Sequence, residues 1–383
     1  MKNLYIHLIT LLVFTFSNAQ IVDIPDANFK NALVNTNCVD TNGDGNVDSD
    51  ADINNDGEIQ VSEAEAVLYL NVTSENISSL EGIQSFINLE DLLCGSNNIT
   101  SLNLSQNSNL IWLFGYENQL TNLDVSQSPN LEYILIDNNQ LTDLDITQNS
   151  NLKRLWCVNN MLTSLDVTNN YNLRILDLEN NALSNIDVSQ NPNLISLLIT
   201  NNQFTSLDIS QNLGLKFLEC DSNQLTSLDL SQNYSLLQLW CNDNQLVNLN
   251  IKNGNNADIT KMWAYNNQDL NCIQVDDETA TYPECDSNSG WCKDDWTEYS
   301  EECILGVEDN TNISFSIYPN PVQDILNLES QQPIERVKIY NLQGQLIMEK
   351  YTNSIDVSNL TTGLYFVQVT VNGKTITKKF LKE

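Results

Sequence analysis

Oxygen-bearing side chains that could bind a metal ion are concentrated between residues 40 and 63. The downstream half of this segment places them at positions 1, 3, 5, 7, 9 and 12 of a loop, where position 7 contributes its backbone carbonyl. These residues are Asp52, Asn54, Asp56, Glu58, Gln60 and Glu63. Carboxylate, amide and carbonyl oxygens are the ligands that Ca²⁺ prefers, and Gly57 permits the sharp turn that the loop needs. The spacing therefore predicts a calcium site.

An upstream loop carries a similar pattern. Its oxygen-bearing residues are Asp40, Asn42, Asp44, Asn46 and Asp48. Ala51 stands where the final Glu is expected, so Asp50 or Asp52 would have to replace it. Both loops resemble the EF-hand or dockerin-type calcium loop, and their tandem spacing resembles thrombospondin-type calcium repeats. The resemblance implies bound Ca²⁺, and the alternative is an Asx-rich loop without metal.

Catalytic groups are scarce in this sequence. The only histidine, His7, lies in a segment with Lys2, an apolar run and Ser17-Asn18-Ala19, which is typical of a secretory signal peptide cleaved after Ala19. Without residues 1–19 the protein has no histidine, which excludes Ser-His-Asp and Cys-His catalysis and histidine-bound zinc. No other stretch is long and apolar enough to span a membrane.

The net charge limits the classes of molecule that the protein could bind. Asp and Glu outnumber Lys and Arg by 50 to 16, for a net charge of −34. This charge argues against nucleic acid and against an anionic membrane surface, both of which need basic protein surfaces. It suits calcium or a basic partner, and a merely solvated secreted surface is the alternative.

The elements that would position these residues follow a strict repeat. Eight aliphatic residues recur every 21 positions: Leu102, Leu123, Leu144, Leu165, Ile186, Leu207, Leu228 and Leu249. Such a period is typical of a solenoid, in which each coil buries its apolar edge against its neighbours. Solenoids present long, regular surfaces, so the repeat favours a binding protein.

One repeat, LEYILIDNNQLTDLDITQNSN from Leu131, shows the pattern L-x-x-L-x-L-x-x-N-x-L, with Asn139 between its halves. The chain is thereby similar to the leucine-rich-repeat family over roughly residues 66–270. The Asn recurs in register, and at a tight turn its side chain can bond backbone groups that the turn leaves unpaired. The resemblance implies the fold and leaves the function open.

Ten coils are expected, with a parallel sheet on the concave face. Their inward strand residues are Leu70, Leu92, Leu113, Ile134, Leu155, Leu176, Leu197, Leu218, Leu239 and Met262. Solenoids need their ends covered. We therefore expect residues 20–65 to form an N-terminal cap in which Ca²⁺ is structural, and residues 271–311 to form a C-terminal cap and linker.

The nine cysteines fall into two groups. Four share one inward position of the repeat and are expected to be small buried apolar residues: Cys94, Cys157, Cys220 and Cys241. Four others lie in the polar stretch after the last coil and predict two disulfides, for which we favour Cys272–Cys303 enclosing Cys285–Cys292. The sequence alone leaves this connectivity open. Cys38 is expected to be buried in the N-terminal cap.

Aromatic residues collect on the outward positions of the concave strands, where folding does not require them. They are Trp112, Phe114, Tyr116, Tyr133, Trp156, Phe217, Trp240, Trp263 and Tyr265. Adjacent strands lie about 4.8 Å apart, so a nearly continuous aromatic ladder is expected. A large exposed apolar patch usually marks a contact site, although aromatics also favour strands as such.

Two partner classes remain open for this face. It could bind a protein, with carboxylates meeting Lys or Arg, which is the commoner use among leucine-rich-repeat proteins. It could instead stack on sugars, with hydroxyls taken by the acidic residues Asp137, Asp177, Glu179, Glu219 and Asp221. Paired carboxylates could in principle cleave a glycosidic bond, but here they belong to a repeat surface, so we expect no enzyme. A purely structural surface-layer role is a further alternative.

The composition changes near Ile313. Residues 312–383 contain six acidic and seven basic residues. Their alternating apolar residues, with turns at Gly344 and Gly363, predict a small antiparallel β-sandwich. The segments Tyr318–Pro321, Asn341–Gly344 and Thr362–Tyr365 strongly resemble the C-terminal sorting domain of the Bacteroidota type IX secretion system. That resemblance implies recognition by the secretion machinery and a protein that is released or anchored at the outer cell surface.

Overall fold

The computed structural model describes residues 20–286, 289–303, 315–330, 333–371 and 374–383. The expected signal peptide, with His7, and most of the expected linker lie outside these ranges. The chain divides into two compact units, one up to Cys303 and one after it. No helix among the described residues is long and apolar enough to cross a membrane.

The first unit is a curved stack of short coils with a parallel sheet along its inner side, and the predicted leucine-rich-repeat solenoid is confirmed. The sheet is 11-stranded. Its strands are β1 (Tyr69–Asn71), β2 (Asp91–Leu93), β3 (Trp112–Phe114), β4 (Tyr133–Leu135), β5 (Arg154–Trp156), β6 (Ile175–Asp177), β7 (Ser196–Leu198), β8 (Phe217–Glu219), β10 (Gln238–Trp240), β12 (Lys261–Trp263) and β14 (Gly290–Cys292). β14 adds an eleventh strand from the cap to the ten expected from the sequence.

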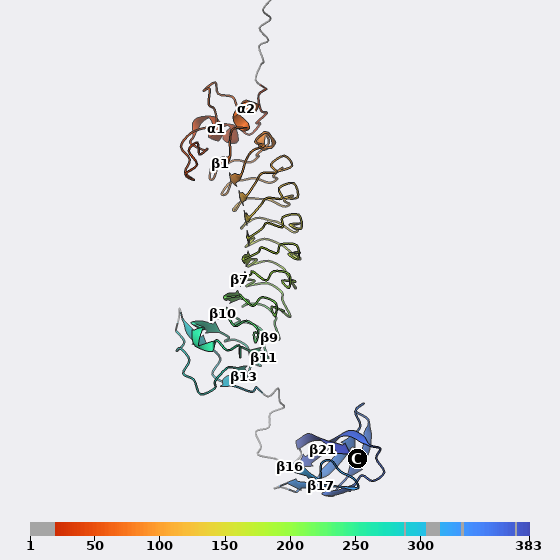
Figure 1. Ribbon diagram of the computed structural model, residues 1–383. Coiled ribbons are helices and arrows are strands. Elements are labelled where there is room, and N and C mark those ends of the chain that lie inside the picture. The colour runs from red at the N-terminus through yellow and green to blue at the C-terminus, as the bar shows by residue number, and fades with distance from the viewer. Residues whose placement is uncertain (1–19, 287–288, 304–314, 331–332, 372–373) are drawn as a thin grey trace, which may run out of the picture. The chain divides into compact units, whose positions relative to one another are not determined.

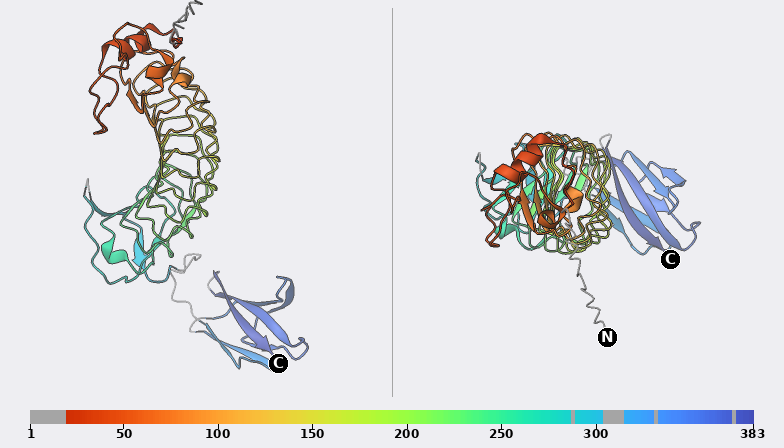
Figure 2. Two further views of the ribbon diagram at one scale, coloured as in Figure 1. Left: turned by 45° about the horizontal axis from the view of Figure 1, so that its top comes forward. Right: turned by 90° about the horizontal axis from the view of Figure 1, so that it is seen from above.

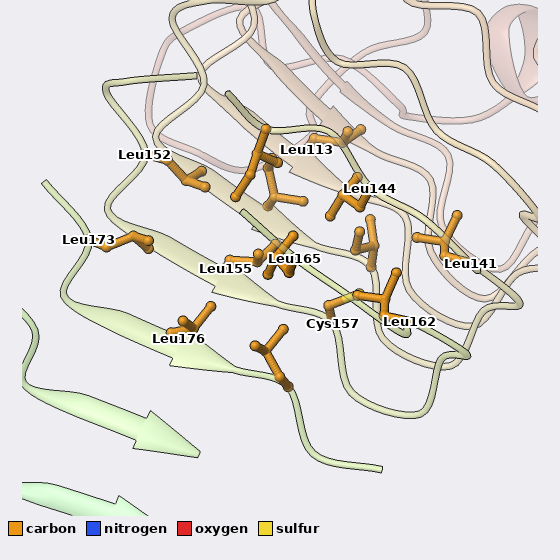
Figure 3. Packing of buried hydrophobic residues seen from close by; sticks show 14 of the residues in the cluster. Leu113, Leu141, Leu144, Leu152, Leu155, Cys157, Leu162, Leu165, Leu173 and Leu176 are labelled. Carbon is orange, nitrogen blue, oxygen red and sulfur yellow. The ribbon is translucent and has the colours of Figure 1, made fainter. Parts of the chain in front are cut away.

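This sheet lines the inner side of the curved solenoid (Figures 1 and 2). Strands are only three residues long because the chain must turn to close each coil, and the middle residue of each repeat strand points inward and is buried. Figure 3 shows the result, with Leu113, Leu155 and Leu176 from the strands packed against Leu144 and Leu165 from the opposite side of the coils. The two outer residues of each strand remain available on the concave face.

The recurrent Asn acts as the sequence predicts. In one coil the Nδ2 of Asn160 donates to the carbonyl oxygens of Ile136, Cys157 and Val158, and its Oδ1 accepts from the Leu141 N–H at 3.0 Å. The preceding Asn159 has φ of +53°, a left-handed conformation that Asn tolerates well. This turn therefore repeats with its backbone groups satisfied.

A second row of Asn was not identified from the sequence. Its members are fully buried at the end of each coil: Asn107, Asn149, Asn170, Asn191, Asn212 and Asn233. Asn170 illustrates the row, because its Nδ2 donates to the carbonyls of Ile146 and Asn149 at 3.0 and 2.8 Å. The row ties each coil to the one before it.

The N-terminal cap contains α1 (Ala27–Asn35) and α2 (Val61–Ala64). One carboxyl oxygen of Asp26 accepts from Asn28 and Phe29 N–H at the start of α1, and the other accepts from Ser78 and Ser79 N–H in the first coil. Val39 pairs antiparallel with Leu70 of β1. The cap therefore covers the edge that the sheet would otherwise expose.

The C-terminal cap extends the solenoid on both sides. Opposite the concave sheet, a second parallel sheet contains β9 (Ser227–Asp229), β11 (Asn248–Asn250), β13 (Cys272–Gln274) and β15 (Glu298–Ser300). Two 3₁₀ turns, Ile83–Ser85 and Asn256–Asp258, complete the first unit. The disulfides Cys272–Cys303 and Cys285–Cys292 are present, in the connectivity that we favoured.

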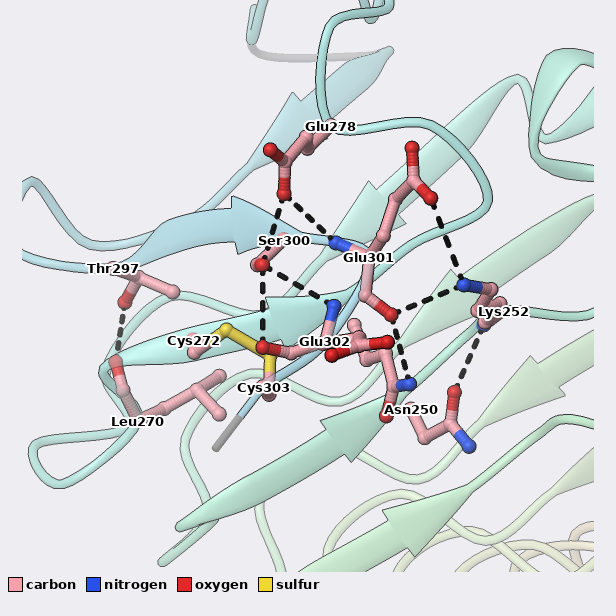
Figure 4. The surroundings of a disulfide bond; sticks show 11 residues. Asn250, Lys252, Leu270, Cys272, Glu278, Thr297, Ser300, Glu301, Glu302 and Cys303 are labelled. Carbon is pink, nitrogen blue, oxygen red and sulfur yellow. Dashed lines mark hydrogen bonds and ion pairs between the residues drawn. A yellow bond between two sulfur atoms is a disulfide. The ribbon is translucent and has the colours of Figure 1, made fainter. Parts of the chain in front are cut away.

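The surroundings of the Cys272–Cys303 bond are shown in Figure 4. The Lys252 ammonium donates to the Glu301 carbonyl at 3.1 Å, and Glu278 accepts from Ser300 and from the Glu301 N–H. These contacts bind the last residues of the unit to β11 and to the loop after β13. They close the apolar end of the solenoid with polar groups, as a terminal coil requires.

The second unit is the predicted antiparallel sandwich. One sheet contains β16 (Phe315–Tyr318), β17 (Ile325–Ser330) and β20 (Ser354–Asp356), and the other contains β19 (Leu346–Lys350), β18 (Arg336–Tyr340), β21 (Gly363–Val371) and β22 (Lys374–Lys382). Between the sheets lies a separate apolar core that includes Leu326, Val337, Val367 and Phe380.

Candidate functional site

The aromatic side chains of the concave face form two groups and not one continuous ladder, which corrects the expectation from the sequence. The first group lies on β3 to β5. The rings of Trp112 and Tyr133 stack at 4.1 Å, and Phe114 meets Trp112 edge-on at 5.4 Å. The Arg154 guanidinium lies 5.8 Å from the Tyr133 ring centre and 5.7 Å from that of Trp156. Trp112 is 37% exposed and the other rings are half-buried.

The second group lies on β10 and β12. The rings of Trp240 and Trp263 are 6.3 Å apart, and Tyr265 lies 6.0 Å from Trp263. The Lys261 ammonium lies 3.8 Å from the Trp263 ring centre and 4.5 Å from that of Trp240, a cation–π arrangement. The Nε1–H of Trp263 is buried and has no hydrogen-bond partner.

Two further predicted residues lie outside both groups. The ring of Tyr116 lies over Gly95 in the neighbouring coil, where an added Cβ would come within 2.5 Å of the ring. Gly95 is thus required by close packing. Phe217 is half-buried on β8, between the groups.

Carboxyl groups lie on the concave side beside and between the two aromatic groups, one in the coil of β4 and the others in the coils of β6 and β8. We call Asp137, Asp177, Glu179, Glu219 and Asp221 the acidic centre. All five are partly buried. Thr200 donates to Asp221 at 2.7 Å, and the Val158 N–H donates to Asp137 at 2.7 Å. Within the described residues, no ion pair joins any of the five to Lys or Arg.

Burial without a cation changes the ionisation of these groups. Burial, and then the charge of Glu179, raises the pKa of Asp177 to about 7. Burial, and then the charges of Glu179 and Asp221, raises the pKa of Glu219 to about 7. The pKa values of Glu179 and Asp137 are also raised, chiefly by burial. Asp177 and Glu219 therefore exchange protons near neutral pH, because burial and neighbouring negative charge outweigh the attraction of Lys261, which lowers the pKa of Glu219.

The downstream calcium loop has side chains that converge. Asp52 and Glu63 are only 3% and 5% exposed. The carboxylate of Asp52 accepts from Asp56 and Gly57 N–H, and that of Glu63 accepts from Asn54 and Gln60 N–H. Two carboxylates are thus held inside one turn without a basic side chain against either of them.

The remaining oxygen donors of this loop lie in contact with one another. The Asn54 Nδ2 donates to Gln60 Oε1 at 2.7 Å and to Asp56 at 3.1 Å. The Glu58 N–H bond, together with Gln60 and Asn54, lowers the pKa of Asp56. No three His, Cys, Asp or Glu side chains in the described ranges converge closely enough to hold a metal by themselves. A cation here would need the amide oxygens and the Glu58 carbonyl as well, which is the donor set of the predicted loop. On this chemistry, the residues fit Ca²⁺.

The upstream loop is more open. It is the exposed connection between Val39 and Ser49, which pair with each other. Asp40 accepts from Gly45 N–H at 2.7 Å, as Asp52 does from Gly57. Asp48, at the far end, is exposed and bonds to Thr41 and Asn42. The two loops share their turn, but only the downstream loop buries its carboxylates.

The inward cysteines are free and buried, as predicted, and Cys38 is buried in the N-terminal cap. Burial raises the pKa of the Cys94 thiol to about 12 and also raises those of Cys157, Cys220 and Cys241. They therefore serve as apolar residues and not as metal ligands or nucleophiles.

Two of the three motif segments of the second unit, Asn341–Gly344 and Thr362–Tyr365, lie next to each other. The Asn341 side chain accepts from Gln343 and Gln345 N–H, and Gly344 has φ of +75°. The Tyr365 hydroxyl donates to the Thr361 carbonyl at 3.0 Å. Residues from both loops line a cavity of about 420 Å³. The loops are held by their own hydrogen bonds.

Comparison with known proteins identifies the second unit. Residues 316–383 match the secretion system C-terminal sorting domain, which indicates a protein that is secreted or attached to the outer cell surface. A segment of 78 residues is 35% identical to an ulvan lyase from Nonlabens ulvanivorans, covering 19% of this chain. The chain spans only 15% of the length of that lyase.

Solved structures with a similar fold include InlJ from Listeria monocytogenes, at 22% identity and a TM-score of 0.49 over 95% of this chain and 98% of that one. YopM from Yersinia pestis has 24% identity and a TM-score of 0.44 over 54% and 56% of the two chains. A leucine-rich-repeat protein from Leptospira interrogans has 24% identity and a TM-score of 0.40 over 56% and 75%. Likenesses of this size say nothing about what the protein binds.

Proposed function

We propose that this protein is a non-catalytic binding or adhesion protein that recognises a protein partner through the concave face of its solenoid. The observation that carries the proposal is the chemistry of that face. Two groups of aromatic rings, neither needed for the core, flank carboxyl groups that have no basic partner in the described chain. Aromatic anchors dominate protein–protein binding energies, and unpaired charges give specificity.

A binding screen against surface proteins and glycans in calcium-containing buffer tests this proposal. The test variant replaces Trp112, Trp156 and Trp240 by Ala. The matched control replaces Tyr171 and Tyr234, which are 52% and 54% exposed and lie outside the concave strands. We expect a protein ligand that is lost in the Trp variant and retained in the control. A ligand that both variants retain would place the site elsewhere, and a glycan ligand would favour the carbohydrate-binding alternative.

We further propose that Ca²⁺ bound by the downstream loop braces the N-terminal cap. The buried carboxylates of Asp52 and Glu63 support this proposal, because their charges need compensation. Ligand binding to the folded state contributes about 2.7 kcal/mol when free calcium exceeds Kd a hundredfold. Chelation should therefore lower Tm. Glu63→Gln should abolish the calcium dependence and Asp48→Asn should leave it largely intact, whereas a Tm indifferent to calcium in the parent protein would refute the brace.

The sorting-domain match supports export through the type IX system, with residues 312–383 as the signal that the machinery recognises. Removal of these residues should leave the protein in the periplasm, as followed by cell fractionation. Normal surface display of the truncated protein would contradict this assignment.

A further inference from the structure

The acidic centre differs from an ordinary charged surface because, among the described residues, no Lys or Arg forms an ion pair with its carboxyl groups. Two cations lie near it, but each is held over aromatic rings. Arg154 lies over Tyr133 and Trp156, and Lys261 lies over Trp240 and Trp263. Lys261 lowers the pKa of Glu219, but within the described residues neither cation forms an ion pair with the centre, so its carboxyl groups are electrostatically complementary to a donor with a positive charge.

Asn242 borders the acidic centre, because by the repeat register it occupies the same outward position as Asp221 in the preceding coil. It is 5% exposed, and its Nδ2 donates to Asp243. Its buried Oδ1 has no hydrogen-bond partner, as is true of the Asn row inside the coils, so this oxygen belongs to the packing of the solenoid and does not contact a ligand. The ligand is therefore defined by the carboxyl groups and the aromatic rings.

The aromatic groups set the length of the ligand. Trp156 on β5 and Trp240 on β10 are separated by four strand-to-strand steps. At about 4.8 Å a step, the separation is about 19 Å, which an extended chain spans with roughly six residues. Asp177, Glu179, Glu219 and Asp221 lie between these positions, so a charged residue at the middle of such a segment would face them.

Resting on the proposed function, we propose that the concave face binds an extended segment of its protein partner in which a basic side chain, best an arginine, enters the acidic centre. Apolar residues about three positions before and after the basic residue lie on the two aromatic groups. The planar guanidinium carries five N–H donors, which matches a centre made of several carboxyl groups.

A metal ion is the other occupant that acceptors could suit. The geometry favours the basic side chain, because in the described ranges no three acidic side chains come close enough together to hold a metal. A guanidinium reaches carboxylates spread over several coils, whereas an ion requires them at a single point.

A phage-displayed library of random dodecapeptides, selected on the purified protein in calcium-containing buffer, tests the inference. We expect enriched peptides to carry a basic residue flanked at about three positions by apolar residues. Replacement of that Arg by citrulline, which keeps its shape and removes its charge, should weaken binding at least about tenfold. The citrulline peptide needs no protein variant, so the result does not depend on a variant's folding.

The protein variants then assign the contacts. Asp177→Asn with Glu219→Gln should remove the preference for a basic residue, and the control pair Asp166→Asn with Asp187→Asn should retain it. Enriched peptides without a basic preference that fail to bind the Trp variant would overturn this inference and leave the proposed function standing. Peptides that bind the Trp variant equally well would overturn both, and an absence of enrichment would overturn the inference.

Discussion

The same residue type behaves in opposite ways on the two sides of the solenoid. On the outer side an exposed row of Asp recurs every coil, and hydrogen bonds from the Ser or Thr two residues later lower the pKa of Asp124, Asp145, Asp166, Asp187 and Asp208. On the concave side, burial and like charge raise the pKa of Asp177 to about 7. The outer carboxylates are satisfied by hydrogen bonds from their own turns, whereas Asp177 accepts only one long hydrogen bond, at 3.3 Å.

The hydrogen bonds to these carboxylates show which acidic residues stabilise the fold. Asp166 accepts from the Thr168 N–H at 2.9 Å and from its hydroxyl at 2.6 Å, so its charge stabilises the coil that carries it. Asp177 accepts one long bond, from the Glu179 N–H at 3.3 Å, and gains the repulsion of its neighbours. A buried charge that costs stability and has no ion-pair partner among the described residues is a candidate for a binding role, as we propose for the concave face.

Charge reversal should produce the largest contrast between the two sides. Asp177→Lys with Glu219→Lys should weaken binding of the selected basic peptide about a hundredfold or more, because it replaces attraction by repulsion in a partly buried site. Asp166→Lys with Asp187→Lys makes the same change in net charge on the outer side and should have little effect. Calorimetric titration measures both. Equal losses would show that only the overall charge of the protein matters.

The pH dependence of binding should give the next largest effect. The groups facing one another are Asp137, Asp177, Glu179, Glu219 and Asp221, with Lys261 and Arg154 at the borders. Below pH 7 the centre is partly protonated, and a bound cation lowers the carboxyl pKa values and releases protons. Affinity for the Arg peptide should therefore rise about tenfold from pH 6 to pH 8. The citrulline peptide should show a flat profile, and a parallel rise for both peptides would contradict the assignment.

The free energy of unfolding should respond in the opposite direction to binding: neutralising Asp177 should weaken binding but stabilise the fold. The pKa of Asp177 is higher in the folded state than in the unfolded state, so its folded form holds a proton that the unfolded chain has already released. Stability is therefore lost as pH rises from about 4 to 7. Asp177→Asn should remove this loss and add about 2 kcal/mol at pH 8, allowing for partial exposure.

The matched change on the outer side is Asp166→Ala. The pKa of Asp166 is lowered in the folded state, so its charge stabilises the protein above the unfolded pKa and this contribution disappears as pH falls. The variant should be slightly less stable at pH 8 and equal to the parent protein in acid. Thermal unfolding across pH 4 to 8 measures both variants. A loss of stability in Asp177→Asn at pH 8 would contradict the claim that the charge of Asp177 destabilises the folded protein.

The sequence predicted what repeats and missed what depends on contacts between coils. The 21-residue period specified the coils, the strands and the turn Asn, and the cysteine spacing suggested the disulfides that form. It did not reveal the division of the aromatic residues into two groups, because ring stacking between Trp112 and Tyr133 depends on side-chain orientation. Nor did it show that Asn242 is buried with an unpaired oxygen, since its position in the repeat matches residues that are half-exposed.

The smallest expected effect tests whether side-chain hydroxyl bonds cause the lowered pKa of the outer Asp residues. Thr168→Val removes one hydroxyl from the outer row and keeps the shape of the side chain. The pKa of Asp166 should rise toward its ordinary value, because the hydroxyl bond to its carboxylate is lost, although the N–H bond remains. The pKa of Asp177, on the other face, should not move. Carbon-detected NMR titration of the two carboxyl groups measures both values. An Asp166 pKa that stays low in this variant would mean that the row owes its ionisation to the backbone alone, and that the hydroxyls of the repeat do not distinguish the two sides.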